Sequence, residues 1–556
     1  MKRLLFSLLI SCGLMASAQQ YSNPILNGFY PDPAICRAGN DYYLVNSSFA
    51  YYPGLPIFHS KDLVSWKQIG HAMDRPEQLD LMGAGVSRGL FAPSITYYKG
   101  LFYIVCTLID KGGNFVITAK DPKGPWSNPV WLKNAQGIDP SLYFDEETDK
   151  AYLVYNSIPP DNKSLWNGHR TIRLRSFDYK NLKASDEETL LVNGGTDTTK
   201  HPVWIEAPHI YKINGQYYLM CAEGGTGFNH SEVIFRSKNV DGPYESYKGN
   251  PILTQRHLDP NRKFPITTAG HADLVETPDG KWYAVFLGCR PYEGDFYNIG
   301  RETFLTPVRW KDGWPVITEG DEEVKYFYPL PQPNINKKPV NPFSGNFTYR
   351  NDFNSSNLDD RFIFLRTVTD KWYNTSDRKG FLGMQVRPET VGGRANPSFV
   401  GFRQSHIKCT ATVALSFNPA AENEKAGLTI FQSERNFYYL CRSMEGNKPV
   451  IQLYKSKPRE EMDLLKSQTL PGNAQNVYLR IVSEGPTYSF YWSADNKKWN
   501  LLLDGVDGKF LSTSVAGGFV GSVFGMYATS LGKPSTSKTY FNWIEYKGND
   551  DVYKQK

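Results

Sequence analysis

Cysteine is scarce in this 556-residue sequence, and none of the seven cysteines lies close to another. A zinc site or a dithiol redox motif needs cysteines within a few residues of each other, so the sequence predicts neither. Most of the cysteines lie in apolar, strand-like runs, which predicts buried thiols. A Cys409–Cys441 disulfide is compatible with an exported protein, but no spacing requires it.

Runs of basic residues and long apolar segments are also missing. The formal net charge is only +6, and no Lys/Arg-rich run stands out, which argues against a nucleic-acid partner. Beyond the N-terminus, no segment offers the roughly 20 apolar residues of a membrane-spanning helix. Helical patterns are scarce as well, which disfavours a parallel α/β fold, where helices alternate with strands.

The N-terminus predicts export. Lys2 and Arg3 precede an apolar run, and Ala16-Ser17-Ala18 fits a cleavage site, so residues 1–18 are predicted to be a signal peptide. The expected destination is the periplasm. A second interpretation is a lipoprotein signal, with Cys12 acylated and the protein anchored at the cell surface. Cleavage after Ala18 is preferred, because a signal ending at Cys12 would be unusually short.

A short pattern recurs through the first 300 residues. An acidic or small residue precedes proline, then a small or polar residue and Ile or Leu, and an aromatic-rich strand pattern follows. The five copies are Asp32-Pro33-Ala34-Ile35, Ala92-Pro93-Ser94-Ile95, Asp139-Pro140-Ser141-Leu142, Ala207-Pro208-His209-Ile210 and a degenerate Ala272-Asp273-Leu274. Such units, each with about four short strands, predict a five-bladed β-propeller over residues 19–328.

Three acidic residues stand at equivalent places in these repeats: Asp32, Asp139 and Glu206. In a propeller the first strand of each blade lines the central channel, so these side chains should meet in one pocket, on backbone fixed by neighbouring prolines. Without a metal motif or a nucleophile–His–Asp pattern, three carboxylates predict glycoside hydrolysis. One would act as base and one as acid, while the third raises the acid's pKa.

The propeller half resembles glycoside hydrolase family 43, the β-xylosidases and α-L-arabinofuranosidases, from about Tyr21 to Tyr328. The matching motifs are Tyr30-Pro31-Asp32-Pro33, Phe91-Ala92-Pro93, Gly137 to Leu142, Glu206-Ala207-Pro208-His209, Ala222 to His230, Ala269-Gly270-His271-Ala272 and Gly300-Arg301-Glu302-Thr303. The resemblance implies that Asp32 is the general base, Glu206 the general acid and Asp139 the residue that tunes and orients the acid. It also implies inversion at the anomeric carbon, with base and acid carboxyls roughly 6.5–9.5 Å apart.

The same resemblance implies further site residues. Arg301 and His271 match residues at the floor of the family's pocket, and Phe49 matches an aromatic wall. Phe91 stands where many relatives have Trp, so the shape of this subsite is expected to differ. No cofactor is required, although some relatives hold a structural calcium ion near the residue that matches His271.

The second half predicts a separate domain. Residues 329–345 are rich in Pro and Asn and predict a linker. Alternating strand patterns over 346–548 predict a β-sandwich of the jelly-roll, concanavalin-like kind, similar to the C-terminal domain of one branch of the family. The stretch Gly517–Ala528 could lean over the pocket with Phe519 or Phe524 at its tip. The alternative is that both phenylalanines belong to the sandwich core.

These inferences together predict an exo-acting, inverting glycosidase that removes terminal α-L-arabinofuranosyl residues from hemicellulose-derived oligo- or polysaccharides. A β-D-xylosidase, or an enzyme with both activities, is a close alternative. A retaining fructan-hydrolysing propeller enzyme and a non-catalytic sugar-binding protein are more distant ones. The first would place its nucleophile in an Asn-Asp-Pro context rather than the Pro-Asp-Pro found here, and the second would be expected to have lost one acid. The sequence does not indicate an oligomeric state.

Overall fold

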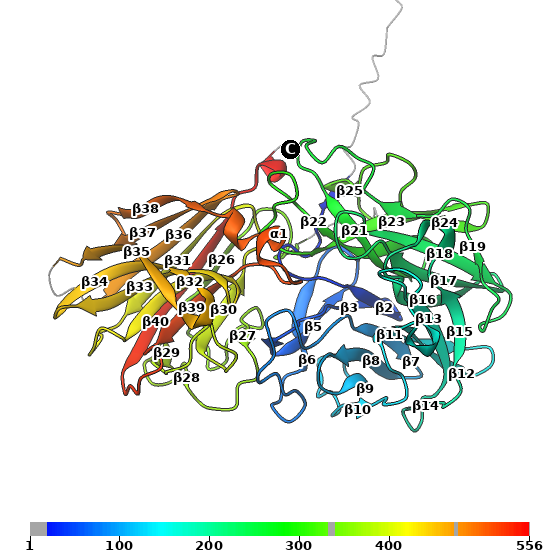
Figure 1. Cartoon of the computed structure of the whole chain (residues 1–556), viewed down its shortest axis with the longest axis horizontal. Helices are drawn as coiled ribbons and strands as arrows, with labels where there is room; N and C mark the ends of the chain where they lie inside the picture. Colours follow the sequence, from blue (N-terminus) through cyan, green and yellow to red (C-terminus); the bar gives the residue numbers. More distant parts are fainter. Residues whose placement is uncertain (1–18, 332–339, 472–475, 555–556) are drawn as a thin grey trace, which may run out of the picture.

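The computed structural model describes residues 19–331, 340–471 and 476–554, and it folds them into two all-β domains that lie side by side (Figure 1). The first is a five-bladed β-propeller and the second a two-sheet β-sandwich, which confirms the predicted fold class. The predicted signal peptide, Cys12 and the middle of the predicted linker lie outside the described residues.

Each blade is an antiparallel sheet built from consecutive strands. Blade one has β2 (Ala34–Ala38), β3 (Asp41–Val45), β5 (Gly54–Ser60) and β6 (Lys67–Met73). Blade two has β7 (Ser94–Tyr98), β8 (Leu101–Leu108), β9 (Gly113–Ala119) and β10 (Val130–Trp131). Blade three has β11 (Ile138–Asp145), β12 (Lys150–Ser157), β13 (Thr171–Asp178), β14 (Lys183–Ala184) and β15 (Thr189–Asn193). Blade four has β16 (Glu206–Ile213), β17 (Gln216–Glu223), β18 (Ser231–Ser237), β19 (Glu245–Ser246) and β20 (Leu253–Thr254). Blade five has β21 (Thr267–Glu276), β22 (Trp282–Cys289), β23 (Glu302–Lys311) and β24 (Trp314–Val316).

The repeated proline pattern marks the entry of the inner strands. The pairing of β11 with β12 shifts register between Ile138 and Ser141, and that of β16 with β17 shifts between Glu206 and His209. A proline cannot donate to a strand ladder and is tolerated at such bulges, which also re-aim the neighbouring side chains. Asp139 and Glu206 lie at these two bulges, which direct their side chains into the channel.

The ring closes without exchanging a strand between the first and last blades. Instead β1 (Gln20–Ser22) pairs with β25 (Phe327–Pro329) beside the seam between blades one and five. Across this seam the Ile35 amide donates to Asp273 at 2.8 Å and the Asn46 side chain donates to the Thr303 hydroxyl at 3.0 Å. The described ends of the predicted linker pack here too, because Leu330 and Phe343 join the apolar cluster between these blades.

Two sheets form the sandwich. One contains β26 (Thr348–Asn351), β28 (Tyr373–Asn374), β29 (Leu382–Gln385), β40 (Lys538–Gly548), β31 (Lys408–Ser416), β36 (Asn476–Glu484), β37 (Thr487–Ser493) and β38 (Asn500–Asp507). The other contains β30 (Ser398–Arg403), β39 (Val523–Thr529), β32 (Lys425–Ser433), β33 (Asn436–Glu445), β34 (Lys448–Ser456) and β35 (Met462–Thr469). Cys409 on β31 and Cys441 on β33 lie in opposite sheets, and both are buried free thiols, so the conceivable disulfide between them is not formed.

Strand pairing and buried charge join the two domains. The short strand β27 (Phe364–Leu365) of the second domain pairs with β4 (Tyr51–Tyr52) of blade one. Arg290 of blade five donates to Glu302 at 2.6 Å and to Asp550 of the second domain at 2.7 Å, and all three side chains are buried. A buried charge is costly unless it is paired, so separating the domains would leave this arginine without one of its partners.

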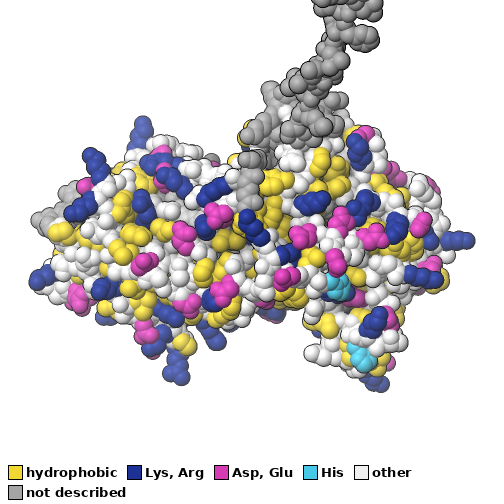
Figure 2. All heavy atoms as spheres, turned by 90° about the horizontal axis from the view of Figure 1, so that it is seen from above, with side chains coloured by type: hydrophobic (Ala, Val, Ile, Leu, Met, Phe, Trp, Pro, Cys, Tyr) yellow, Lys and Arg dark blue, Asp and Glu magenta, His cyan; other side chains and the backbone are white. Residues whose placement is uncertain are grey.

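On the face shown in Figure 2, acidic and basic side chains are interspersed over both domains. None of the helices in the described segments is long and apolar enough to cross a membrane.

Candidate active site

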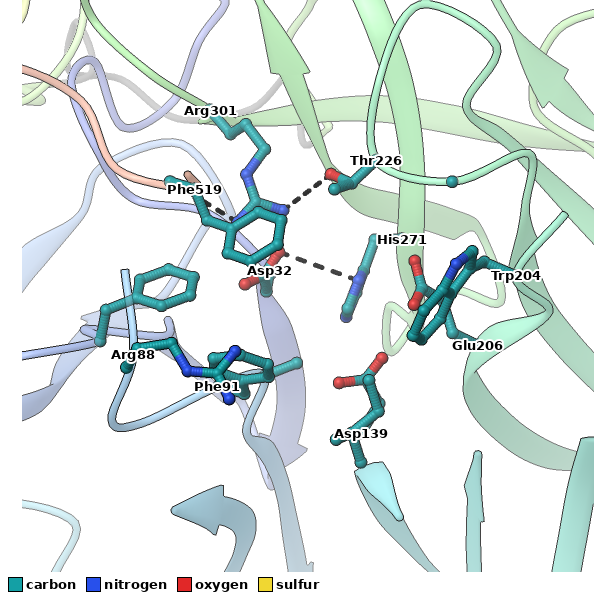
Figure 3. A pocket seen from close by; sticks show the side chains of 14 residues that line it. Asp32, Arg88, Phe91, Asp139, Trp204, Glu206, Thr226, His271, Arg301 and Phe519 are labelled. Carbon is teal, nitrogen blue, oxygen red and sulfur yellow. Dashed lines mark hydrogen bonds and ion pairs between the residues drawn. The ribbon is translucent and has the colours of Figure 1, made fainter. Parts of the chain in front are cut away.

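One end of the propeller channel opens into a cavity of about 460 Å³. All three predicted catalytic carboxylates line it and point into the same space (Figure 3). The five other predicted site residues line it as well: Phe49, Phe91, His271, Arg301 and Phe519. Segments far apart in the sequence thus meet at one place, as the repeat pattern predicts.

Backbone strain holds several of these side chains in place. Asp32, Asp139 and His271 have φ values of 50°, 53° and 56°, in the left-handed region. Residues other than glycine seldom adopt this conformation, and they keep it only when the surrounding structure imposes it. The orientation of the two aspartates is therefore a property of the folded blades rather than of the local chain.

Asp32 is buried and carries a negative charge. Its carboxylate accepts hydrogen bonds from Arg301 at 2.8 Å and from the Ser47 hydroxyl at 2.5 Å, and His271 Nδ1 lies 3.8 Å away. Burial alone would raise the pKa of Asp32, but the Arg301 guanidinium and the Ser47 hydroxyl lower it below its ordinary value. This carboxyl is therefore ionised at neutral pH and can accept a proton.

The pKa values of Glu206 and Asp139 are shifted in the opposite direction, upward. Burial raises the pKa of Glu206 well above its usual value, and the nearby charges of Asp139 and Asp32 raise it further. Burial and the charge of Asp32 likewise raise the pKa of Asp139. Because like charges in one cavity disfavour ionisation, a proton is retained on this side of the pocket near neutral pH. The cavity thus holds an ionised carboxylate and a proton donor.

Asp139→Asn should shift the alkaline limb of the kcat/KM profile toward lower pH by about one unit. The alkaline limb reports loss of the proton from Glu206, and removing the neighbouring negative charge lowers the pKa of that acid. A pH–rate series on the variant and the wild type measures the shift. Asp145→Asn, at the far end of the same strand, is the matched control and should leave the limb in place. A limb that stays put or moves to higher pH in Asp139→Asn would contradict the assignment.

Arg301 ties the base to two other parts of the cavity. Its guanidinium donates to the Thr226 hydroxyl at 2.9 Å and to the Phe519 carbonyl at 3.4 Å, in addition to Asp32. His271 is buried, and burial lowers the pKa of its ring to about 3, so the ring is neutral. In the described parts of the chain, no group of three or more His, Cys, Asp or Glu side chains is placed to hold a metal ion. The calcium ion therefore remains a prediction from the resemblance.

Three phenylalanines from both domains form an aromatic wall. Phe519 stacks on Phe49 with ring centroids 5.9 Å apart and meets Phe91 edge-on at 6.0 Å. Its backbone amide donates to the Ser87 hydroxyl of the propeller at 2.9 Å. Phe524, in contrast, is fully buried on β39 between Phe402 and Ile430. The sandwich loop therefore contributes Phe519 to the cavity, while Phe524 belongs to the sandwich core.

Phe519→Ala should raise KM by about tenfold, because the variant removes one face of the wall on which a sugar ring can stack. Phe519→Leu keeps an apolar side chain and should recover part of the loss. Initial rates over a range of substrate concentrations measure both variants, with melting temperatures to confirm folding. Unchanged kcat and KM in Phe519→Ala would remove this residue from the site.

Sequence reasoning missed four residues that touch the site: Ser47, Arg88, Trp204 and Thr226. Arg88, Trp204 and Thr226 line the cavity, and Ser47 holds the base. Trp204 lies two residues before Glu206, and an aromatic residue this close to a predicted catalytic acid could have indicated a site residue. Arg88 lies in a long loop before β7, where no repeat pattern marks it.

Comparison with known proteins identifies the family. The family model described as glycosyl hydrolases family 43 matches residues 21–315, more than half of the chain. The chain belongs to glycoside hydrolase family 43. A model of the β-xylosidase C-terminal concanavalin A-like domain matches residues 350–547 of this family 43 enzyme.

Full-length relatives agree with this assignment. A "Xylosidase/arabinosidase" of Butyrivibrio fibrisolvens is 39% identical over 94% of this chain and 98% of its own. The "Non-reducing end alpha-L-arabinofuranosidase BoGH43B" of Bacteroides ovatus is 36% identical over 95% of this chain and 94% of its own. A crystal structure of a GH43_12 from a capybara gut metagenome has a TM-score of 0.85 and 42% identity, covering 92% of this chain and 96% of that one. The protein is a glycosidase that hydrolyses glycosidic bonds in hemicellulose.

Proposed function

We propose that this family 43 enzyme is an exo-acting, inverting α-L-arabinofuranosidase. Asp32 is the general base and Glu206 the general acid. Asp139 raises the pKa of Glu206 and orients its side chain. The observation that carries the proposal is the opposite direction of the pKa shifts within one cavity. Arg301 and Ser47 keep Asp32 ionised, whereas burial and neighbouring charge keep a proton on the side of Glu206. A pair of carboxyls whose pKa values are pushed apart divides into base and acid.

The reaction follows from these protonation states. A water molecule attacks the anomeric carbon as Asp32 removes one of its protons. Glu206 donates its proton to the glycosidic oxygen as the bond between that oxygen and the anomeric carbon breaks. The new hydroxyl forms on the opposite face, so the configuration inverts. Asp32 ends protonated and Glu206 ionised, and exchange with solvent restores both.

The exo mode rests on the wall contributed by the second domain. Phe519, Phe49 and Phe91 border the catalytic cavity, and Arg301 also bonds to the Phe519 backbone. A cavity closed in this way accepts the end of a chain rather than its middle. Release of long oligosaccharides from a polymer would overturn this part of the proposal.

The preference for arabinose over xylose is supported by the name of the Bacteroides ovatus relative, a non-reducing end α-L-arabinofuranosidase. The alternative, β-xylosidase or dual activity, is supported by the Butyrivibrio fibrisolvens relative, whose name joins both activities. The two sugars present similar hydroxyl groups, so the same hydrogen-bond donors can serve either one.

Initial rates on 4-nitrophenyl α-L-arabinofuranoside and 4-nitrophenyl β-D-xylopyranoside test the substrate. Faster hydrolysis of the arabinofuranoside supports the proposal, and faster hydrolysis of the xyloside favours the alternative. NMR of the first product formed distinguishes inversion from retention. Activity on neither sugar, together with none on natural oligosaccharides, would overturn the proposed function.

We also propose that the protein is exported, with residues 1–18 removed as a signal peptide and the periplasm as its destination. The basic start, the apolar run and Ala16-Ser17-Ala18 support this. Anchoring through an acylated Cys12 is the alternative. N-terminal sequencing and cell fractionation of the wild type and Cys12→Ser separate the two, because only an anchored protein would change fraction in the variant.

A further inference from the structure

A second cavity, of about 630 Å³, adjoins the catalytic one. The two share two lining residues, Ile138 and Trp204. Ile138 directly precedes Asp139, and Trp204 lies two residues before Glu206. The second cavity, here named the blade-three groove, therefore begins on the side of the catalytic cavity that carries Glu206. Figure 3 shows Trp204 beside Glu206 at this edge.

The position of Glu206 indicates which part of the substrate faces the groove. If Glu206 protonates the glycosidic oxygen, as the proposed function holds, the leaving group must lie next to Glu206. A leaving group longer than one sugar must continue past Trp204. The blade-three groove is the continuation that the structure describes on that side, so this inference rests on the proposed function.

The groove wall is polar and carries charged groups of both signs. Arg173 and Arg175 both line it and share one partner, Glu188, so this cluster keeps one positive charge, and Asp161 adds a second carboxylate to the wall. Arg170 is different: its guanidinium lies 3.9 Å from the Trp204 ring centroid and donates to the His169 carbonyl at 2.9 Å. Within the described residues, no carboxylate lies within ion-pair distance of Arg170. Its remaining donors can bond to sugar hydroxyls beside the Trp204 ring.

The loops that carry these residues are tightly fixed. Trp166 stacks on His169 with ring centroids 4.2 Å apart, and its indole N–H donates to the Pro202 carbonyl at 2.6 Å. Gly168 has φ +83°, and a Cβ there would lie 2.8 Å from the Val203 side chain. The loop before β13 and the loop before β16 are thus locked together, which preorganises the wall between them.

We propose that the blade-three groove binds the leaving-group part of the substrate, a neutral oligosaccharide chain of more than one sugar unit. Arg170 and Trp204 would hold the sugar at the junction of the two cavities. The amide side chains of Gln136 and Asn162 also line the groove and can bond to the hydroxyls of the following sugars. The enzyme would then prefer terminal pentoses that are attached to a longer chain.

The test compares kcat/KM on arabinosylated xylobiose, xylotriose and xylotetraose, in which every leaving group is a sugar chain. Unsubstituted xylo-oligosaccharides replace these substrates if the enzyme is a xylosidase. For the wild type, kcat/KM should rise by about tenfold along the oligosaccharide series. In Arg170→Ala this rise should disappear. The comparison is made within each enzyme, so a change in the chemical step common to all substrates cancels. Arg170→Lys keeps the charge and should recover part of the rise.

Arg236→Ala is the matched control. Arg236 stacks over Trp314 at 4.2 Å in a pair that lies outside both cavities, so its loss should leave the dependence on chain length unchanged. A flat series in the wild type, or an unchanged rise in Arg170→Ala, would overturn the proposal. If the wild type cleaves no pentoside, the proposed function fails, and calorimetry with xylotetraose then decides on the groove. Binding that is weakened in Arg170→Ala would support the groove, and binding that is absent or unchanged would overturn it.

Discussion

Asp32→Asn should lower kcat by about 10²–10⁴-fold, the usual contribution of a general base. The asparagine keeps the shape of the side chain but cannot accept a proton from water. Single-turnover rates on a nitrophenyl substrate measure the loss. Nitrophenolate leaves without protonation, so the measured rate reports the attack of water that Asp32 assists.

Loss of the Asp32 charge should also affect stability. A folded-state pKa below the unfolded value means that the charge stabilises the fold above the unfolded pKa, and that this stability is lost as the pH falls through the folded pKa. At pH 7 the variant should therefore melt at a lower temperature, with Arg301 left buried without its anion.

Asp273→Asn is the control for Asp32→Asn. Asp273 belongs to the corresponding repeat of blade five, where it accepts hydrogen bonds from the Ile35 amide and the Tyr211 hydroxyl. It does not line the catalytic cavity. This variant should lose stability yet retain most of the activity of the fraction that remains folded. An Asp32→Asn enzyme that keeps more than about a tenth of the wild-type kcat would contradict the assignment of the base.

Glu206→Gln should show a loss that depends on the leaving group. On natural oligosaccharides the expected fall in kcat is about 10²–10⁴-fold, because a sugar alkoxide is a poor leaving group without a proton. On a 4-nitrophenyl glycoside the fall should be far smaller, since nitrophenolate leaves without protonation. The alkaline limb of the pH profile should disappear as well, because it reports the proton on Glu206.

Glu232→Gln separates an acid catalyst from a merely buried glutamate. Glu232 is fully buried, burial raises its pKa well above the usual value, and it accepts a hydrogen bond from the Ala272 amide at 2.9 Å. It does not line the catalytic cavity, so its loss should not depend on the leaving group. Equal losses on both substrates in Glu206→Gln would contradict its role as the acid.

The propeller and its three acidic residues could be predicted because a repeated sequence pattern marks the inner strand of each blade. Asp32 and Asp139 directly precede the proline of their repeats, and Glu206 lies two residues before Pro208. A ring of similar blades brings the entry positions of these acids together. The side chains that set their pKa values were harder to predict. Ser47 and Thr226 are small polar residues in loops, and only the packed blades show that one bonds to Asp32 and the other to Arg301.

The choice between Phe519 and Phe524 shows a second limit. Both lie in one short stretch, and sequence alone left it open whether either one reaches the site. Phe524 lies in a strand flanked on both sides by apolar strands, which places it in the core. Phe519 reaches the site because the Ser87 hydroxyl holds its backbone from the other domain. Contacts between domains of this kind leave no periodic pattern in a sequence.

The seam between the first and last blades has a consequence for how the enzyme fails. Asp32 belongs to blade one, and Arg301 directly precedes β23 of blade five, so the ion pair that keeps the base charged spans the joint of the ring. The Tyr30 amide donates to the Arg301 carbonyl at 3.1 Å across the same joint. If the ring opened slightly at this joint, Asp32 would lose the positive charge of Arg301, its pKa would rise, and it could no longer activate water, although every blade would still be folded. On heating or in denaturant, activity should therefore be lost before circular dichroism records any loss of strand structure. Activity thus reports whether the ring of blades is closed.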